Sequence, residues 1–439
     1  MNIAVIGLGK LGCPLAALLA AAGHEVLGVD TRPDVVKRIN RHEAPVQEPG
    51  LQELMNDVTP RLKATTDSPR AAQWSDATFV VVPTPSDEEG TFSNRYVIEA
   101  AEAIGVGIRS RAAWSLVVIT STVMPGSTDG PIRAALERAS GRVVGTSLGL
   151  CYSPEFIALG SVIRDMTNPD MILIGESDPR SGDRLAEISA GICENTPMIM
   201  RMSLPTAEVA KIAVNSFVTT KISYANMVSE ICEALPGADA EDALRAIGMD
   251  SRIGQKYLRP ATPYGGPCFP RDSVAVAALA RSLGTSADIS EATERINSRQ
   301  MGRILDKVLA ELPAGGRVGI LGLAYKPNTA VIDGSTGVAL AQLLLERAQQ
   351  PIVYDPLAMP AARHLLGEEV LYGKSVADCY QRSDVVVITT PCEDFRFVPE
   401  SEPGVPHPTT VVIDCWSLLD RATLVNNLDL VRFGAGPKP

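Results

Sequence analysis

Residues 2 to 30 carry the pattern that most constrains the fold of this chain. A short apolar segment is followed by Gly7-Leu-Gly9-Lys-Leu-Gly12, an alanine-rich segment and a second apolar segment that ends at Asp30. Glycines permit a tight turn and let a pyrophosphate approach the N-terminus of the following helix. The order of strand, glycine turn, helix and strand therefore predicts a βαβ unit that binds a dinucleotide. The alternative is a glycine-rich turn with a purely structural role.

The acid at the end of the second segment indicates which dinucleotide is bound. Asp30 lies where a carboxylate accepts hydrogen bonds from the adenosine ribose and repels a 2'-phosphate, which favours NAD as the cofactor. Arg32 argues in the opposite direction, because an arginine at this place can hold the phosphate of NADP. In the turn itself, Lys10 and Leu11 join the three glycines as predicted cofactor contacts.

Strand-like segments alternate with helical ones in both halves of the chain, and a helical stretch separates the halves. This alternation predicts an α/β protein with two Rossmann-like, doubly wound, parallel-sheet domains joined by a helical central section. A long helix is expected over 206–234 and a second helical run over 272–312. Strands are expected at 77–85, 115–123 and 171–175, and again at 317–327, 351–356, 383–391 and 410–416.

Composition excludes several classes of protein. The 439 residues carry a net charge of -11, which argues against nucleic acid as a partner. No segment resembles a secretory signal, and no apolar run is long enough to span a bilayer, so we expect no membrane partner. The eight cysteines and four histidines are scattered without metal-ligand spacing. A reduced cytoplasmic location and no metal are therefore expected.

One cysteine lies in an unusual setting. The stretch PYGGPCFPRD places Cys268 after a Gly-Gly-Pro turn, and Asp272 follows just before an apolar helical segment. Glycines around a thiol let a ligand come close, which a buried cysteine does not need. The simpler interpretations are that Cys268 is a small buried apolar residue and that Asp272 is a helix N-cap.

Three other stretches combine polar groups with favourable positions. Ser121 and Thr122 follow a strand, where open α/β sheets bind ligands, and Glu155 follows another. Lys211 and Asn215 are four residues apart, hence on one face of the long helix. Each has a structural alternative, namely a strand-end hydrogen bond, a solvated loop charge and an exposed helix face. Together with a dinucleotide fold and a candidate nucleophile, they match one reaction class.

These motifs together resemble the UDP-glucose 6-dehydrogenase family and its GDP-mannose and UDP-N-acetylhexosamine relatives. The resemblance covers nearly the whole chain through IAVIGLGKLGCPLA, VVPTP, STVMPG, SPEF, EVAKIAVNSF, IGMDSRIGQKYL, YGGPCFPRD and GILGLAYKPNT, in the family's order. It divides the chain into an NAD-binding domain (1–204), a central dimerisation domain with the cysteine (205–312) and a nucleotide-sugar-binding domain (313–439).

The resemblance implies a four-electron oxidation that consumes two NAD. The C6 alcohol of a nucleotide-linked hexose becomes an aldehyde, Cys268 captures it, and a second oxidation leaves a thioester that water hydrolyses to a uronate. Lys211 and Asn215 would stabilise the oxyanion, Asp272 and Thr122 would organise water and proton transfers, and Glu155 would assist hydrolysis.

The resemblance also implies contacts with the ligands and with a second subunit. Arg252 would reach the active site of the partner in a homodimer built on the long helix. Implied contacts with the substrate are Glu155, Phe156, Ile157, Lys211, Asn215, Arg252, Tyr257, Leu258, Tyr264, Gly265 and Lys326; those with the cofactor outside the glycine turn are Pro83, Thr84, Ser121 and Thr122.

Three departures from the family's pattern bear on specificity. Leu159 stands where the family usually has a second glutamate, and Arg271 replaces a lysine. Asp333 and Gly334, within residues 329–336, replace an arginine and a glutamate. UDP-glucose is the favoured substrate, with dTDP-glucose, GDP-mannose and a UDP-N-acetylhexosamine as alternatives, and a weakened nucleotide-sugar binding protein as the alternative to an enzyme.

Overall fold

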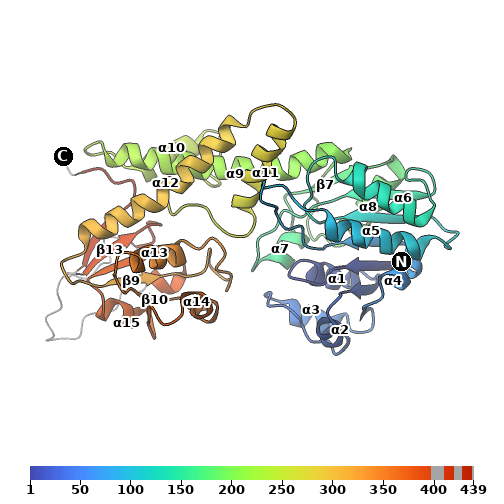
Figure 1. Ribbon diagram of the computed structural model, residues 1–439, viewed down its shortest axis with the longest axis horizontal. Coiled ribbons are helices and arrows are strands. Elements are labelled where there is room, and N and C mark those ends of the chain that lie inside the picture. Colours follow the sequence, from blue (N-terminus) through green and yellow to red (C-terminus); the bar gives the residue numbers. More distant parts are fainter. Residues whose placement is uncertain (397–409, 420–427, 438–439) are drawn as a thin grey trace. The chain divides into compact units, whose positions relative to one another are not determined.

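The computed structural model describes residues 1–396, 410–419 and 428–437 (Figure 1). The chain forms two compact units, residues 1–213 and 214–439, each of which is described by itself. Within the described residues each unit contains one sheet, as the alternation of strand-like and helical segments predicts. Among the described residues, no helix is both long and apolar enough to cross a membrane.

The first unit is built on an eight-stranded sheet of order β3-β2-β1-β4-β5-β6-β7-β8. The strands pair in parallel except at β6 and β7, which are antiparallel. The strands are β1 (Asn2–Ile6), β2 (Glu25–Val29), β3 (Leu62–Thr65), β4 (Ala77–Val80), β5 (Ser115–Ile119), β6 (Leu148–Tyr152), β7 (Met171–Glu176) and β8 (Met198–Ser203).

Helices cover both faces of this sheet, because successive strand residues point to opposite sides. Ile3 and Val5 pack in one apolar cluster with α1 (Gly12–Ala21), α3 (Leu51–Asp57), α7 (Val162–Thr167) and α8 (Pro179–Ala190). Ala4 and Ile6 pack in the other with α4 (Ser68–Trp74), α5 (Arg95–Ile108) and α6 (Arg133–Ser140). Helix α2 (Pro33–Asn40) joins the first cluster, and a π-helix (Thr128–Ile132) precedes α6.

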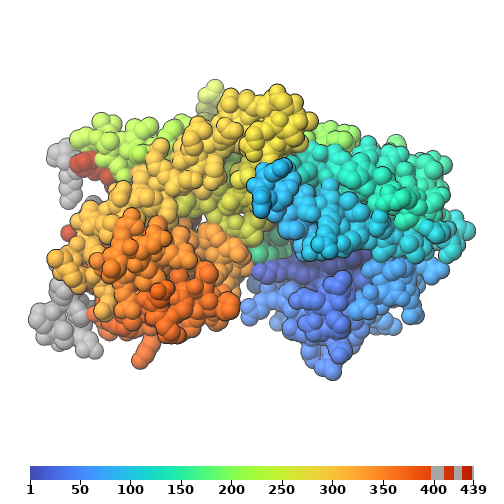
Figure 2. All heavy atoms as spheres, in the orientation of Figure 1, coloured from blue at the N-terminus to red at the C-terminus, as the bar shows by residue number. Residues whose placement is uncertain are grey.

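The helical central section contains α9 (Leu204–Glu233), α10 (Ala240–Met249), α11 (Phe269–Ser282) and α12 (Asp288–Glu311). The helical run expected over 272–312 consists of two separate helices, α11 and α12. The chain leaves α11 at Leu283 and turns at Gly284, whose φ is +70°. This turn, in yellow, lies on the surface in Figure 2, and Leu283 is 70 % exposed.

The second unit contains a six-stranded, all-parallel sheet of order β11-β10-β9-β12-β13-β14. Its strands are β9 (Val318–Leu321), β10 (Ile352–Tyr354), β11 (Leu371–Tyr372), β12 (Val385–Ile388), β13 (Thr410–Asp414) and β14 (Leu428–Arg432). Its helices are α13 (Thr336–Leu345), α14 (Met359–Leu366) and α15 (Val376–Gln381), followed by a 3-10 turn (Glu393–Arg396). This order matches the first six strands of the other sheet and confirms the predicted fold class.

Candidate active site

The first glycine turn has no room for side chains at two of its glycines. Gly7 has a φ of +94°, and a β-carbon there would collide with the carbonyl of Val81. A β-carbon at Gly12 would collide with the carbonyl of Gly7, so α1 begins directly against the strand end. A β-carbon at Gly9 would meet nothing within 4 Å, so the turn is open there. The cradle suits a pyrophosphate at the N-terminus of α1.

Asp30 is placed at the carboxyl edge of the sheet, beside this turn. Its carboxylate accepts hydrogen bonds from the backbone N–H groups of Leu8, at 3.1 Å, and Arg32, at 2.9 Å. The Arg32 side chain is 59 % exposed, and its Nε lies 3.6 Å from the carboxylate. With two backbone donors, the carboxylate retains acceptor capacity for a ribose hydroxyl. Lys10 is exposed and Leu11 half-buried at the same turn.

The side chains at the ends of β4 and β5 hold the two strand ends together. The hydroxyl of Ser121 accepts a hydrogen bond from Val82 N, at 2.8 Å, and donates to Val82 O, at 2.7 Å. Thr84 donates to the carbonyl of Thr122, at 2.7 Å. Pro83 is exposed and the Thr122 side chain half-buried. The hydroxyls of Ser121 and Thr84 thus position the loop, whereas Pro83 and Thr122 remain accessible at its surface.

Lys211 anchors the loop that follows β6. Its side chain is 8 % exposed and donates from Nζ to the carbonyl oxygen of Glu155, at 2.7 Å. The same Nζ lies 4.6 Å from the centre of the Phe156 ring, a cation–π contact. Lys211 therefore does not occupy an exposed helix face.

The Glu155 side chain lies in a partly buried position where ionisation is unfavourable. Burial raises its pKa to about 7, although the positive charge of Lys211 lowers it. A carboxyl group with such a pKa can exchange a proton near neutral pH. Ile157 and Leu159, farther along the loop, pack against the apolar cluster around α1. Leu159 therefore places a packing group where the resembling family usually has a carboxylate.

Glu208 is a residue of this region that the sequence analysis missed. It is fully buried, one turn of α9 before Lys211, and accepts hydrogen bonds from Gly126 N, at 2.6 Å, and Thr128 N, at 2.8 Å. Burial raises its pKa. The signal available in the sequence was an acid on the apolar face of a helix, three residues before a candidate lysine.

In the second unit, Cys268 lies at the N-terminus of α11 and is exposed. Asp272 is in the first turn of this helix, so its interpretation as the N-cap is wrong. The Asp272 carboxylate is 1 % exposed and accepts a hydrogen bond from Asn215 Nδ2, at 2.6 Å. Arg271 Nε lies 3.6 Å from the other carboxylate oxygen. The structure therefore brings Asn215 and Asp272 together beside the cysteine.

The other seven cysteines differ from Cys268. They are buried or half-buried, and burial raises the pKa of each thiol, to about 12 for Cys13 and Cys379. Only Cys268 is exposed among the eight, all of which the structure describes. The N-terminus of a helix favours negative charge, such as that of an attacking thiolate. Cys268 is thus the cysteine suited to act as a nucleophile.

The glycines before Cys268 contact a loop of the C-terminal sheet. Gly266 N donates to the carbonyl of Asp333, at 3.1 Å. Tyr264, before the glycines, is buried and donates from its hydroxyl to Glu294, at 2.7 Å. Lys326 is half-buried, with Nζ 5.9 Å from the Tyr325 ring centre. The Tyr264 hydroxyl is thus used within the protein.

The segment around Arg252 is exposed. The Arg252 side chain is 86 % exposed and pairs with Asp250 at 2.6 Å. Tyr257 has a φ of +67° and packs edge-on against the Phe269 ring. Leu258 is buried in a small apolar cluster, so its side chain serves packing.

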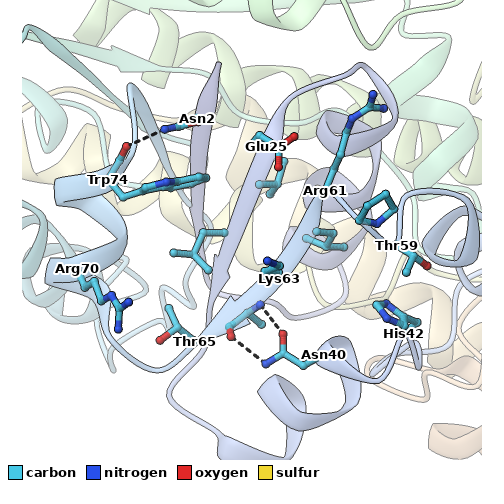
Figure 3. A pocket seen from close by; sticks show the side chains of 15 residues that line it. Asn2, Glu25, Asn40, His42, Thr59, Arg61, Lys63, Thr65, Arg70 and Trp74 are labelled. Carbon is cyan, nitrogen blue, oxygen red and sulfur yellow. Dashed lines mark hydrogen bonds between the residues drawn. The ribbon is translucent and has the colours of Figure 1, made fainter.

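A large cavity of about 980 Å³ lies elsewhere, along the edge strand β3 (Figure 3). Asn40 pairs with both backbone groups of Ala64 there, and Lys63, Arg61 and Arg70 line the opening. None of the predicted site residues lines this cavity. Among the described residues, no group of three or more His, Cys, Asp or Glu side chains could hold a metal ion.

The two sheets and the glycine turn define a nucleotide-binding α/β protein, and comparisons with known proteins give its family. The UDP-glucose/GDP-mannose dehydrogenase family matches through its NAD binding domain at residues 1–192, its central domain at 205–299 and its UDP binding domain at 319–421. The chain belongs to this family of nucleotide-sugar dehydrogenases, and its N-terminal domain binds NAD.

Individual relatives agree with this assignment. UDP-glucose 6-dehydrogenase AglM of Haloferax volcanii is 36% identical over 399 residues, covering 90% of this chain and 92% of that protein. GDP-mannose 6-dehydrogenase of Pseudomonas aeruginosa is 30% identical over 442 residues, covering 95% and 100%. A UDP-glucose dehydrogenase structure from Pyrobaculum islandicum superposes with a TM-score of 0.87 at 34% identity, covering 98% and 96% of the two chains.

Proposed function

We propose that this protein oxidises the C6 alcohol of UDP-glucose to the carboxylate, with NAD as oxidant and Cys268 as covalent nucleophile. The observation that carries the proposal is the setting of Cys268, which alone among the eight cysteines is exposed and lies at a helix N-terminus. A binding protein needs no such group. A reduced thiol is required, which fits a cytoplasmic enzyme.

The covalent steps are assigned to Cys268. NAD supplies the hydride acceptor in each of the two oxidations. After the C6 alcohol has lost a proton and a hydride, the thiolate adds to the aldehyde carbon, and the resulting oxyanion takes up a proton to form a thiohemiacetal. Loss of a second hydride and a proton leaves a thioester, and water then cleaves the carbon–sulfur bond to release the carboxylate and the thiol.

The charged and amide groups around these steps have distinct roles. Lys211 and Asn215, one turn apart on α9, stabilise negative charge on the C6 oxygen. Asp272, held by Asn215 at 2.6 Å, and Thr122 organise a water molecule and proton transfers. Glu155, with a pKa raised to about 7 by burial, takes a proton from the hydrolytic water.

The remaining predicted contacts belong to the ligands. The turn from Gly7 to Gly12 and Asp30 hold the cofactor, together with the strand ends at Pro83 to Thr84 and Ser121 to Thr122. Lys326 binds the nucleotide end of the substrate, and the backbone at Tyr257, Leu258, Tyr264 and Gly265 borders the sugar.

We also propose a homodimer in which Arg252 reaches the active site of the partner. Phe217, Tyr224 and Ile231 are 68 %, 44 % and 59 % exposed and recur every seven residues along α9, which forms an apolar stripe. A second copy would cover this stripe. Sedimentation velocity tests the dimer: Phe217→Glu should yield monomers, and a monomeric wild-type protein would refute it.

The substrate is tested by the stoichiometry of NADH. Limiting UDP-glucose, dTDP-glucose, GDP-mannose or UDP-N-acetylglucosamine is incubated separately with excess NAD. Two NADH per UDP-glucose are expected; two from another sugar would replace the substrate and keep the chemistry. One NADH per sugar would indicate that oxidation stops at the aldehyde, before the thioester forms. Two NADH per enzyme molecule, without further turnover, would indicate failed hydrolysis, a deficit that the absence of a carboxylate at Leu159 would explain. No NADH from any sugar would favour the binding-protein alternative.

The covalent mechanism is tested separately. Cys268→Ser should abolish uronate formation and retain UDP-glucose binding by calorimetry. Cys392→Ser is the matched control, because this half-buried thiol should be dispensable. Undiminished uronate production by Cys268→Ser would refute the mechanism.

A further inference from the structure

The turn before Cys268 is packed, main chain against main chain, on a segment that leaves the C-terminal sheet after β9. A β-carbon at Gly265 would collide with the carbonyl of Gly334. A β-carbon at Gly334 would lie 2.8 Å from Gly266 N. Neither position has space for a side chain, so the two backbones are in direct contact.

A hydrogen bond and an aromatic ring complete this contact. Gly266 N donates to the carbonyl of Asp333, at 3.1 Å. A β-carbon at Gly266 would lie 2.6 Å from two carbons of the Tyr325 ring, so the ring covers the glycine directly. Burial, followed by the charge of Cys268, raises the pKa of Tyr325 to about 12.

Hydrogen bonds are made at both ends of the segment that makes these contacts. Tyr325 N donates to the carbonyl of Val331, at 3.0 Å, which closes the loop that contains Lys326. At the end of the segment, Ser335 caps α13 by accepting a hydrogen bond from Val338 N, at 3.3 Å. Residues 325–334 thus contact Gly265 and Gly266, which precede Cys268 by three and two residues.

We propose that Gly334 is a positioning residue for Cys268, and that a nucleotide bound at Lys326 alters the reactivity of the Cys268 thiol through the contact of residues 325–334 with Gly265 and Gly266. The inference rests on the proposed function, because it assumes that Lys326 binds the nucleotide and that Cys268 reacts. The new element is that the bound nucleotide changes the reactivity of the Cys268 thiol, in addition to holding the substrate.

The test measures alkylation of Cys268 by iodoacetamide, followed by mass spectrometry of the peptide that contains it. This readout requires no turnover, so it separates the inference from the proposed function. Gly334→Ala should change the alkylation rate at least about fivefold and lower kcat about tenfold, while the KM for NAD stays unchanged. Saturating UDP should change the rate at least about threefold in the wild type and have little effect in Gly334→Ala.

Gly315→Ala is the matched control. Gly315 has a φ of +75°, comparable to +62° at Gly334, but a β-carbon there would meet nothing within 4 Å. Gly315→Ala therefore introduces similar backbone strain without a collision with neighbouring atoms. The alkylation rate of Cys268, the UDP response and kcat of this variant should match those of the wild type.

Two substitutions of Tyr325 keep the proposal falsifiable if Gly334→Ala does not fold. Tyr325→Phe retains the ring and should behave as the wild type, whereas Tyr325→Leu should reproduce the altered alkylation rate and lose the UDP response. A wild-type alkylation rate and UDP response in both Gly334→Ala and Tyr325→Leu would overturn the inference. A UDP effect of equal size in wild type and Gly334→Ala would also overturn it, because it would show direct shielding of the thiol.

Discussion

The two sheets use the same glycine packing at the first strand end, but they place very different lengths of chain between the glycines. In the N-terminal sheet, Gly12 packs on the carbonyl of Gly7, and only residues 8–11 lie between them. In the C-terminal sheet, Gly337 packs on the carbonyl of Gly322 in the same way, with residues 323–336 between them. A short turn leaves the helix N-terminus open to a pyrophosphate, whereas the long segment supplies contacts of its own.

The aspartates that follow the second strand of each sheet, Asp30 after β2 and Asp355 after β10, differ in how many backbone hydrogen bonds they accept. Asp30 accepts hydrogen bonds from two backbone N–H groups and is partly accessible. Asp355 is 4 % exposed, and its two oxygens accept from Leu323, Ala324, Leu357 and Ala358. One carboxylate retains capacity for a ribose, and the other is fully used to hold the loop. The comparison shows that a repeated fold need not repeat its ligand site.

Substitution of the glycine at the start of the helix in each packed pair, Gly12 or Gly337, gives the largest expected effect. Gly12→Ala should weaken NAD binding about 100-fold and spare UDP binding, and Gly337→Ala should do the reverse, because each added β-carbon displaces one turn. Calorimetry with each ligand measures both affinities. Gly141→Ala, at a φ of +69° with nothing within 4 Å of its β-carbon, is the control. An equal loss of affinity for NAD and for UDP in either variant would contradict the expectation that the two turns bind their ligands independently.

Substitution of Asp355 should mainly affect stability, whereas substitution of Asp30 should mainly affect NAD binding. Asp355→Asn should lower the free energy of unfolding by about 3 kcal/mol, because buried N–H groups lose their acceptor. Asp30→Asn should cost about 1 kcal/mol or less and weaken NAD binding. Urea denaturation and NADH fluorescence titration measure these effects. A larger stability loss in Asp30→Asn would reverse the assignment.

A pH profile distinguishes two buried acids of the two sheets. Burial raises the pKa of Glu155 to about 7, and burial also raises that of Asp414. If ionised Glu155 promotes hydrolysis, kcat should rise with pH and level off above about 7. Glu155→Gln should lose this rise and be about tenfold slower at high pH. Asp414→Asn should keep the rise, and a flat wild-type profile would refute the role of Glu155.

The same shift has a consequence for stability. Between the ordinary pKa of a glutamate, about 4.5, and the raised value of about 7, folded Glu155 holds a proton that the unfolded chain releases. The unfolded state then binds fewer protons, so the free energy of unfolding falls as pH rises through this window. Glu155→Gln should remove this part of the slope, which urea denaturation at several pH values measures.

The smallest expected effect concerns hydroxyl groups at strand ends. Ser121 exchanges two hydrogen bonds with the backbone of Val82, and Thr389 donates to the carbonyl of Gly322 in the other sheet. Ser121→Ala and Thr389→Val should each lower the free energy of unfolding by about 1 kcal/mol. Thermal unfolding measures the change; Thr146→Val, at an exposed position in a loop, serves as the control. No loss of stability in Ser121→Ala would mean that its hydroxyl serves the cofactor instead.

Short sequence patterns correctly predicted those features of the fold that depend only on neighbouring residues. The glycine turn, Asp30, the long helix and the alternation in both sheets are visible in short windows, because periodicity and backbone freedom are local properties. The expected strand from Ala77 to Pro85 is too long, since β4 ends at Val80 and Val82 bonds to the Ser121 side chain. A run of apolar residues alone does not show where the hydrogen bonds between neighbouring strands end.

The details that were wrong or missed depend on partners distant in the sequence. Aspartate is a residue type common at N-caps, which suggested that a helix begins after Asp272. Pro270 was the better indication of where α11 begins, because proline lacks the N–H that a helix start leaves unpaired. Glu208 bonds to residues about 80 positions earlier. The pairing of Gly322 with Gly337 likewise joins positions that no spacing rule connects.

That pairing bears on how such a protein changes over evolutionary time. Residues 323–336 leave and rejoin the fold at two glycines whose backbones touch, so the ends of the segment stay fixed whatever lies between them. The entropic cost of closing a loop grows only slowly with its length. Because both ends are fixed in this way, the segment can change in length or sequence while β9 and α13 keep their places.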